Sequence, residues 1–341
     1  MQENIPLGPL TTLKVGGIAR YLARIESKED LIAAVDFAHD EDLPIFVLGG
    51  GSNVLVADQG FKGVVLQMAV TEPAATFEES NGIVTCRVAA GIDWDAFVLD
   101  VCERGLSGVE CLAGIPGLVG GTPVQNVGAY GQDVAETIVA VRALDMEAMS
   151  FVSLSAAECG FGYRKSIFNT SAKGRYVVMK VTFRFDAALR LELKYAELAR
   201  HFEGKTPTPM EVYHAVREIR HRKGMLLVEG DADCRSAGSF FKNPVVSEAV
   251  FAALAKEFGE VPHWDAGAGK VKMAAAWLLE KAGFYKGFAM GQAGISSKHT
   301  LAVVNRGEAT TGEILALRDE IRRAVAEKFG VKLEQEPVGL G

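Results

Sequence analysis

Cysteine pairs, long apolar runs and an excess of positive charge are all missing from this sequence of 341 residues. Its five cysteines are widely spaced and include no Cys-x-x-Cys pair, which gives no zinc pattern and favours free thiols in a reducing compartment. No apolar run approaches the ~20 residues of a membrane span, and none follows basic residues at the N-terminus, so we expect no signal peptide. A net charge of −7 argues against a general affinity for nucleic acid. We therefore expect a cytoplasmic enzyme or binding protein with no metal site and no membrane or nucleic-acid partner.

Two nucleotide-binding signatures and one hydrolase signature are also missing. The Gly49–Asn53 run, GGGSN, is followed by valine where a dinucleotide-binding fingerprint needs its third glycine. Gly204–Thr206 lacks the upstream glycine of a P-loop, and no Gly-x-Ser-x-Gly surrounds Ser239. The Gly49–Asn53 run keeps two interpretations, a tight hairpin turn or a concavity of N–H groups for a diphosphate.

An apolar content of 49% and a charged content of 23% are typical of a globular protein, and the length suits two or three domains. Short strand-like stretches alternate irregularly with amphipathic ones, which predicts a mixed α and β protein and not a regular βαβ series. The expected strands are 45–48, 54–57, 63–68, 83–89, 139–144, 176–185, 301–304 and 331–334. The expected helices follow Ser27, Asp93 and Thr208 as N-caps, or span 247–258, 270–282 and 312–329.

The segment Gly114–Gly131, GIPGLVGGTPVQNVGAYG, is the most unusual part of the chain. It contains six glycines and two prolines and almost no charge, a mixture that neither helix nor strand tolerates. A long surface loop is one interpretation. Its apolar side chains favour a buried loop instead, whose backbone groups need partners. Such a loop is suited to offer N–H and C=O groups to a bound ligand, and we call it the glycine-rich segment.

Three further segments carry polar groups in unusual settings. The run Phe161–Phe168, FGYRKSIF, is a poor core strand because an arginine is rarely buried without an anionic partner. Taken alone, this run favours a surface position for Arg164. The helix after Thr208 ends with four cations and a histidine between Arg217 and Lys223, more than compensation of the helix dipole needs, which indicates a local anion site. The run Cys234–Pro244, CRSAGSFFKNP, offers small residues beside two phenylalanines that we expect to anchor it.

Taken in order, these motifs resemble the UDP-N-acetylenolpyruvoylglucosamine reductase family, the flavoenzymes of bacterial cell-wall precursor synthesis. The resemblance covers about residues 10–336 and rests on TTLKVGGIA, VLGGGSNVL, the glycine-rich segment, FGYRKSIF, AGSFFKNPVV and LEQE. Each motif is weak alone, but six of them in this order are specific.

The resemblance implies an α+β fold, with an FAD-binding domain of the vanillyl-alcohol-oxidase / p-cresol-methylhydroxylase type in two subdomains and a C-terminal α+β substrate-binding domain. The implied boundaries are residues 1–70 with 331–341 for the first FAD-binding subdomain, 71–222 for the second, and 223–330 for the substrate-binding domain. The first subdomain is expected to recover the terminal strand near 331–336.

The resemblance also implies roles for particular residues. The FAD diphosphate is expected at Gly49, Gly50, Gly51, Ser52 and Asn53. The flavin and its ribityl chain are expected at Ile115, Pro116, Gln125, Asn126, Gly128, Ala129 and Tyr130, with Arg220 nearby. The implied catalytic residues are Arg164, Ser239 and Glu336, with Tyr163 beside them; Glu334 is the alternative to Glu336. Lys223 and Asn243 match groups that bind the UDP diphosphate, and Tyr195 matches the substrate-covering tyrosine loop of one family type.

The implied activity is an oxidoreductase reaction on a carbon–carbon bond. NADPH reduces tightly and non-covalently bound FAD, and the vinyl carbon of UDP-N-acetyl-enolpyruvoylglucosamine then receives hydride to give UDP-N-acetylmuramate. By the same resemblance, Arg164 and Glu336 are expected to stabilise the resulting enolate and Ser239 to protonate its carbon. We expect a monomer through the resemblance alone. The rivals are an FAD oxidase of a small alcohol and a non-catalytic flavin or nucleotide-sugar binding module.

Overall fold

The computed structural model describes residues 1–188 and 191–341, which form two compact units. Unit 1 contains residues 1–5, 19–51 and 62–222, and unit 2 contains residues 6–18, 52–61 and 223–341. Each unit buries a hydrophobic core of its own. The units group residues by compactness, whereas the predicted domains divide them by function, so the three-domain division stays a prediction.

Unit 1 begins with a four-stranded sheet in the order β1-β2-β5-β3. The strands are β1 Gln2–Pro6, β2 Ile18–Ile25, β3 Ile45–Leu48 and β5 Phe61–Met68, with β3 and β5 parallel. Helix α1, Lys28–Asp40, begins at Ser27, whose Oγ accepts a hydrogen bond from the Asp30 N–H at 3.0 Å. The buried face of α1 belongs to the same core as β2 and β5.

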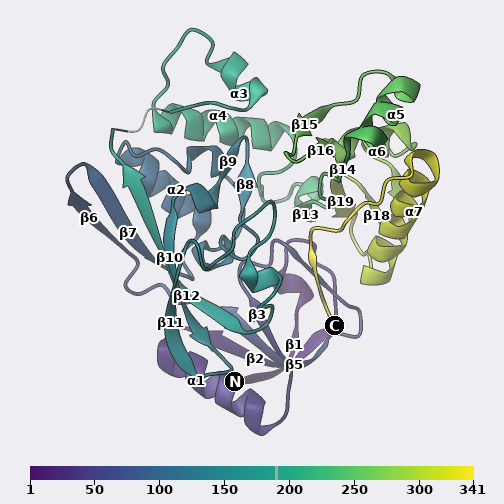
Figure 1. The fold of residues 1–341 in the computed structure, drawn as a ribbon. Helices are drawn as coiled ribbons and strands as arrows, with labels where there is room; N and C mark the ends of the chain where they lie inside the picture. The colour runs from purple at the N-terminus through teal and green to yellow at the C-terminus, as the bar shows by residue number, and fades with distance from the viewer. Residues whose placement is uncertain (189–190) are drawn as a thin grey trace. The chain divides into compact units, whose positions relative to one another are not determined.

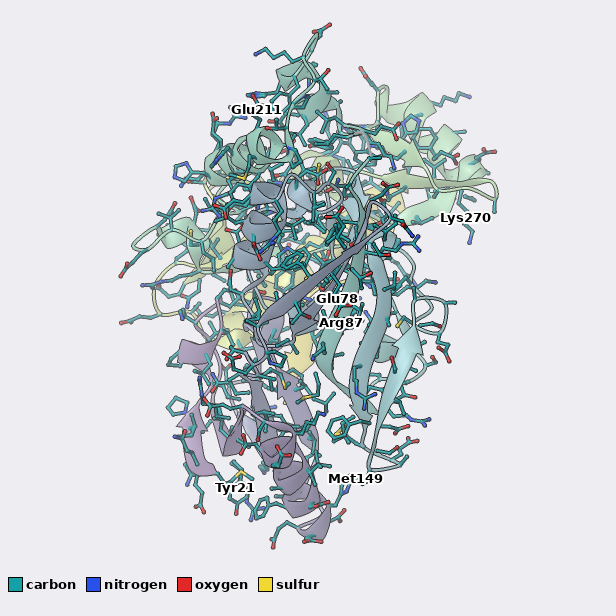
Figure 2. The ribbon with its side chains drawn as sticks, turned by 90° about the vertical axis from the view of Figure 1, so that its left-hand side faces the viewer. Tyr21, Glu78, Arg87, Met149, Glu211 and Lys270 are labelled. Atoms are coloured by element: carbon teal, nitrogen blue, oxygen red, sulfur yellow. The ribbon has the colours of Figure 1, made fainter. Side chains whose placement is uncertain are left out.

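The second sheet of unit 1 is antiparallel, in the order β11-β10-β12-β7-β6. Its strands are β6 Ala75–Ser80, β7 Ile83–Ala89, β10 Ile138–Asp145, β11 Ser150–Ser155 and β12 Tyr176–Asp186. Figure 1 shows these strands running between α1 at one end of unit 1 and α4, Pro209–Arg222, at the other. Figure 2 shows Glu78 and Arg87 on β6 and β7, where their side chains pair at 2.6 Å.

Helix α2, Trp94–Glu103, packs on the second sheet through aromatic contacts: the rings of Phe97 and Phe183 lie 4.9 Å apart, and Trp94 lies 6.2 Å from Phe183. The remaining short elements of unit 1 are α3 Ala196–His201, the hairpin strands β8 Gly128–Ala129 and β9 Gln132–Asp133, and the 3-10 turns η2 Glu110–Leu112, η3 Val119–Gly121, η4 Val134–Glu136 and η5 Ile167–Asn169.

Unit 2 contains a sheet in the order β13-β19-β18-β17, a second sheet β14-β16-β15, and a parallel pair of β4 and β20. The strands are β4 Val54–Val56, β13 Ser236–Ser239, β14 Val245–Ser247, β15 His263–Asp265, β16 Lys270–Met273, β17 Ala289–Met290, β18 Ala293–Ile295, β19 Ala302–Asn305 and β20 Val338–Leu340. The helices are α5 Glu248–Phe258, α6 Ala275–Lys281 and α7 Thr311–Phe329, and the 3-10 turns are η1 Gly8–Leu10 and η6 Ala232–Cys234.

Two N-terminal segments join unit 2 through specific polar bonds. Buried Asn305 donates from Nδ2 to the Leu13 carbonyl at 3.1 Å. Asp58 accepts the Thr311 and Gly312 N–H groups at 2.8 and 2.9 Å and thereby caps α7. These bonds fasten residues 6–18 and 52–61 to the C-terminal part of the chain.

Three sequence-based expectations about secondary structure are wrong. The helix expected over 270–282 is instead strand β16 followed by α6. In β16 the buried Val271 and Met273 alternate with the more exposed Lys270 and Lys272, which is the two-residue period of a strand. The strand expected at 331–334 lies at 338–340 instead, where it pairs with β4. The hairpin interpretation of Gly49–Asn53 fails because β3 pairs with β5 and β4 pairs with β20, in different sheets.

Among the described residues, none of the helices combines the length and the apolar character that a membrane crossing requires.

Candidate active site

The glycine-rich segment lies against the junction of β7 and α2. The Val119 and Gly120 N–H groups donate to the carbonyls of Ile92 and Ala90, both at 2.9 Å, and the Trp94 N–H donates to Gly117 at 3.0 Å. Val119, Thr122 and Asn126 are buried within the segment. The surface-loop interpretation is therefore wrong, and the backbone of this segment is held by hydrogen bonds, as expected of buried chain.

The glycine turn at residues 49–51 and the glycine-rich segment approach each other backbone to backbone in unit 1, at Gly50 and Gly117. A Cβ atom added at Gly50 would lie 2.7 Å from the Gly117 Cα, closer than real Cβ contacts. Glycine is therefore needed at this point of approach. The turn at 49–51 thus lies directly beside residues 115–118, which brings two of the predicted cofactor-binding motifs together within unit 1.

Asn126 fastens the Phe161–Phe168 segment to the glycine-rich segment. Its Nδ2 donates to the Gly162 carbonyl at 3.1 Å, and its Oδ1 accepts the Ala135 N–H at 3.1 Å. Ser166 adds a bond from Oγ to the Val124 carbonyl at 2.6 Å. Motifs almost forty residues apart in sequence therefore form one structure.

Arg164 lies at the centre of this structure. Its Nη2 donates to the Gly128 carbonyl at 2.5 Å, and its Nη1 lies 3.8 Å from Oδ1 of Asp133. The guanidinium carbon is 5.4 Å from the centre of the Tyr163 ring. The Arg164 side chain is only 19% exposed, so its interpretation as an ordinary surface residue is wrong. Asp133, its anionic neighbour, has no signal in the sequence that would have identified it.

Three of the predicted site residues have left-handed backbones. The φ angles of Asn126, Tyr130 and Arg164 are 47°, 50° and 53°. Few non-glycine residues adopt this conformation, which persists where surrounding bonds hold the backbone. The Asn169 side chain provides one such bond, from Nδ2 to the Arg164 carbonyl at 3.2 Å.

Tyr130, Tyr195 and Arg220 form a second group in unit 1. The rings of Tyr130 and Tyr195 meet edge to face, 5.1 Å apart at 83°. Burial lowers the pKa of the Arg220 guanidinium, and Tyr130, which hydrogen-bonds to it, opposes that shift. Arg220 thus presents a cation with little water around it beside the glycine-rich segment.

The basic end of α4 does not act as one group. Arg217 forms an ion pair with Asp95, and Arg222 lies 3.3 Å from Glu197 and 3.6 Å from Glu218. The expectation of a single local anion site from Arg217 to Lys223 is therefore too broad, because two of its cations have carboxylate partners inside unit 1.

Ser239 lies at the end of β13 in unit 2, opposite Ala302 of β19. The two residues that follow it, Phe240 and Phe241, are fully buried and anchor the segment as predicted. Gly238, with a φ of 70°, provides the irregular backbone just before the serine.

Glu336 lies beside the segment that contains Ser239 and Phe240. Its N–H donates to the Phe240 carbonyl at 2.9 Å, so its backbone lies next to that of Ser239's neighbour. Glu336 is half-buried, whereas the side chain of Glu334 is 76% exposed and lies 3.5 Å from Lys242. The structure thus places Ser239 and Glu336 on adjoining backbone segments within unit 2.

The other predicted residues of unit 2 have mixed settings. Asn53 donates from Nδ2 to the Glu336 carbonyl at 3.4 Å, and its own carbonyl accepts the Val338 N–H at 2.9 Å. Asn243 accepts the Ala275 N–H at 3.0 Å through Oδ1, which caps α6. Lys223 is half-buried and directly follows α4.

Sequence reasoning missed Asp95 and Glu110, which support the glycine-rich segment. Oδ1 of Asp95 accepts the Gly114 N–H at 2.5 Å. Glu110 is 1% exposed and accepts the Gln132 side chain at 2.6 Å, while Gln132 accepts the Cys111 N–H at 2.9 Å. A lone carboxylate in a helix or turn carries no signal of such a role.

These features fit a dinucleotide cofactor with a diphosphate. Glycine backbones in close approach can offer N–H groups to phosphate oxygens, and the poorly hydrated Arg220 guanidinium lies beside Tyr130 of the same segment. Among the described residues, no cluster of three or more His, Cys, Asp or Glu side chains is placed to hold a metal ion.

Comparisons with known proteins agree with this fit. A family model described as an FAD binding domain matches residues 19–149, and a model described as the C-terminal domain of UDP-N-acetylenolpyruvoylglucosamine reductase matches residues 230–340. The chain is 47% identical to the UDP-N-acetylenolpyruvoylglucosamine reductase of Thermobifida fusca, over 99% of this chain and 98% of that protein. It is 46% identical to the enzyme of the same name from Streptomyces coelicolor, over 99% and 90%.

A solved structure of a reductase of this name is also similar to the chain. The crystal structure of UDP-N-acetylenolpyruvylglucosamine reductase from Thermus caldophilus matches with a TM-score of 0.67 and 27% identity, over 99% of this chain and 98% of that one. Together with the two family matches, it confirms the predicted fold class, in which an FAD-binding domain is joined to a C-terminal α+β domain.

Proposed function

The chain belongs to the UDP-N-acetylenolpyruvoylglucosamine reductase family, and from this we propose that it reduces UDP-N-acetyl-enolpyruvoylglucosamine to UDP-N-acetylmuramate with NADPH and bound FAD. The observation that carries the proposal is Arg164: a largely buried guanidinium is fixed to the Gly128 carbonyl of the glycine-rich segment. A simple flavin or nucleotide-sugar binding module has no use for this arrangement. The product is a precursor of peptidoglycan.

FAD supplies the relay of hydride from NADPH to the vinyl carbon when it is bound. Non-covalent attachment is supported by the glycine-rich segment itself, which contains neither histidine nor cysteine. We assign the diphosphate to the Gly49–Asn53 turn, and we place Arg220 near the flavin and its ribityl chain, beside Tyr130. The residues assigned to the flavin and the ribityl chain are Ile115, Pro116, Gln125, Asn126, Gly128, Ala129 and Tyr130.

We assign to Arg164 the stabilisation of the enolate that forms when the vinyl carbon accepts hydride. The negative charge of that species spreads onto the substrate carboxylate, and a planar guanidinium can bind a carboxylate through two parallel hydrogen bonds. Bonds to Gly128 and Asn169 hold Arg164 in place before substrate arrives. Such preorganisation stabilises developing charge without reorganising the site. Tyr163 lies beside the guanidinium, 5.4 Å from its carbon, and we assign it a supporting role.

We assign to Ser239 the transfer of a proton to the carbon of the enolate, and to Glu336 a second stabilising contact. A serine hydroxyl is a weak acid, but the carbon of an enolate is a strong base, so the transfer needs chiefly exact placement. The adjoining backbones of Ser239 and Glu336 support the pairing, and the solvent exposure of Glu334 argues against that carboxylate.

We assign the UDP diphosphate to Lys223 and Asn243 and a substrate-covering role to Tyr195. The contact of Tyr195 with Tyr130 supports membership of the family type with a tyrosine loop. We further propose the division into two FAD-binding subdomains, 1–70 with 331–341 and 71–222, and a substrate-binding domain, 223–330. A monomer in the cytoplasm completes the proposal.

A Ser239→Ala variant tests the reaction and separates it from the rivals. The variant should accept hydride from NADPH at the wild-type rate, because the serine has no part in that step, and should fail to turn over the enolpyruvyl substrate. Flavin reduction and reoxidation are followed by absorbance in an anaerobic stopped-flow instrument. Full turnover by Ser239→Ala would refute the assigned proton donor. A wild-type protein that oxidises a small alcohol but not NADPH would favour the oxidase.

A further inference from the structure

We propose that Asp95 is a positioning residue for the cofactor site, which fixes the beginning of the glycine-rich segment to helix α4. This inference rests on the proposed binding of FAD by that segment. Asp95 touches neither cofactor nor substrate in this account; it acts through the backbone of Gly114, whose next two residues are Ile115 and Pro116.

The two oxygens of the Asp95 carboxylate face different elements. Oδ1 accepts the Gly114 N–H at 2.5 Å, and Oδ2 accepts the Tyr213 hydroxyl at 3.3 Å and forms the ion pair with Arg217. The Asp95 and Arg217 side chains are 23% and 34% exposed, so the pair is partly shielded from water. A charge-assisted bond in such a place is stronger than a surface ion pair.

The protonation of Tyr213 agrees with its place as a donor. Burial, with the nearby Asp95 carboxylate as the second cause, raises the pKa of Tyr213 to about 12. The phenol therefore keeps its proton at neutral pH and donates a hydrogen bond to the Asp95 carboxylate.

Helix α4 holds the glycine-rich segment at both ends. Tyr213 and Arg217 are one turn apart and reach Gly114 through Asp95, while Arg220 follows three residues later and hydrogen-bonds Tyr130. Residues spaced by three and four lie on one face of a helix. One rigid helix face thus sets the distance between the two ends of the segment.

A purely local role in α2 does not account for Asp95. The N-cap of α2 is Asp93, which already accepts the Ala96 N–H at 2.9 Å. A carboxylate in the first turn also favours the helix dipole, but that effect needs no contact with other elements. The contacts of Asp95 with Gly114 and α4 lie outside its own helix.

The test compares Asp95→Asn with Asp100→Asn. Asparagine at position 95 keeps an oxygen for the Gly114 N–H but cannot pair with Arg217. Asp100 is the matched control, because it lies on the same helix and pairs with Arg104 at 2.8 Å on the surface. The dissociation constant of FAD is measured by diluting each holoenzyme and recording the fluorescence of released FAD, and the thermal unfolding of each FAD-free protein is recorded alongside.

We expect Asp95→Asn to weaken FAD binding about tenfold, equivalent to ~1.4 kcal/mol, and Asp100→Asn to leave it unchanged. Excess FAD should restore the turnover of Asp95→Asn, which a general loss of folding would not allow. If Asp95→Asn does not fold, Arg217→Gln removes the same ion pair from α4 and should weaken FAD binding likewise. Equal FAD binding by Asp95→Asn and wild type would overturn the inference, as would a lower unfolding temperature without weaker binding. A wild-type protein that binds no FAD would instead overturn the proposed function.

Discussion

Replacing Gly50 by alanine tests the close approach of the two glycine turns. The added Cβ would lie 2.7 Å from the Cα of Gly117 and 3.3 Å from its carbonyl carbon, whereas ordinary contact begins at 3.4 Å. The two backbones must therefore separate by roughly 0.7 Å, and neither offers a flexible side chain that can turn aside.

Overpacking of this kind costs about 1–3 kcal/mol, which corresponds to a factor of roughly 5 to 160 in an equilibrium constant. We expect the cofactor-free Gly50→Ala variant to lose this much free energy of unfolding in urea. We also expect weaker FAD binding, because the turn assigned to the diphosphate is displaced. Both quantities are measured on the same preparation, unfolding by circular dichroism and binding by flavin fluorescence.

Gly121→Ala is the matched control. Gly121 lies in the glycine-rich segment, but no heavy atom outside its own neighbours lies within 4 Å of an added Cβ. Its substitution should leave stability and FAD binding near wild type. If Gly50→Ala behaved like Gly121→Ala in both measurements, the backbone contact with Gly117 would have no energetic importance and the reasoning would fail.

Three further predictions concern the proposed catalytic side chains and the buried thiols. Arg164→Lys keeps the positive charge but loses the planar guanidinium, so turnover of the enolpyruvyl substrate should fall by ~10²–10³-fold. Reduction of the flavin by NADPH should keep its rate, and anaerobic rapid mixing measures both steps. Equal losses in both steps would contradict the role of Arg164 in stabilising the enolate. Glu336→Gln should lower turnover, and Glu334→Gln, at the exposed position, should not; steady-state assays with the opposite order would move the role to Glu334. Burial raises the pKa of Cys86 to about 12 and of Cys159 to about 11 from 9.0. Above pH ~9 only the unfolded chain loses these thiol protons, so the free energy of unfolding in urea should fall between pH 8 and 10. It should fall less in Cys86→Ala than in wild type. An identical fall in the two proteins would refute thiol ionisation as the cause.

The sequence predicts the elements whose signals are local. Helix α7, expected over 312–329, spans Thr311–Phe329 and ends at Gly330, which has a left-handed φ of 65°. The first turns of α1 and α2 are likewise set by Ser27 and Asp93. These caps depend on neighbours in the chain, so the pattern of residue types is sufficient.

Other elements depend on distant partners and escape the sequence. Strand β20 is defined by its parallel pairing with β4, nearly three hundred residues earlier. The left-handed backbone of Arg164 is accompanied by bonds to Gly128 and Asn169, and the sequence around Arg164 identifies neither of them as a partner. Long-range pairing of this kind overrides local propensity.

The candidate site divides in the same way. Glycine and arginine in unusual surroundings mark the proposed cofactor-binding segments, because these residues fit poorly in an ordinary helix or core strand. The supporting carboxylates Asp95, Glu110 and Asp133 lie in ordinary polar surroundings in the sequence, and only the folded contacts distinguish them from solvated side chains.

An anaerobic absorbance titration of the purified protein tests the central claim most directly. We expect a yellow protein whose flavin bands are bleached by NADPH and restored by UDP-N-acetyl-enolpyruvoylglucosamine. Bleaching by NADPH without restoration would contradict the proposed substrate while leaving the assignment of the flavin intact. A colourless protein that takes up no added FAD would contradict the assignment of the cofactor itself.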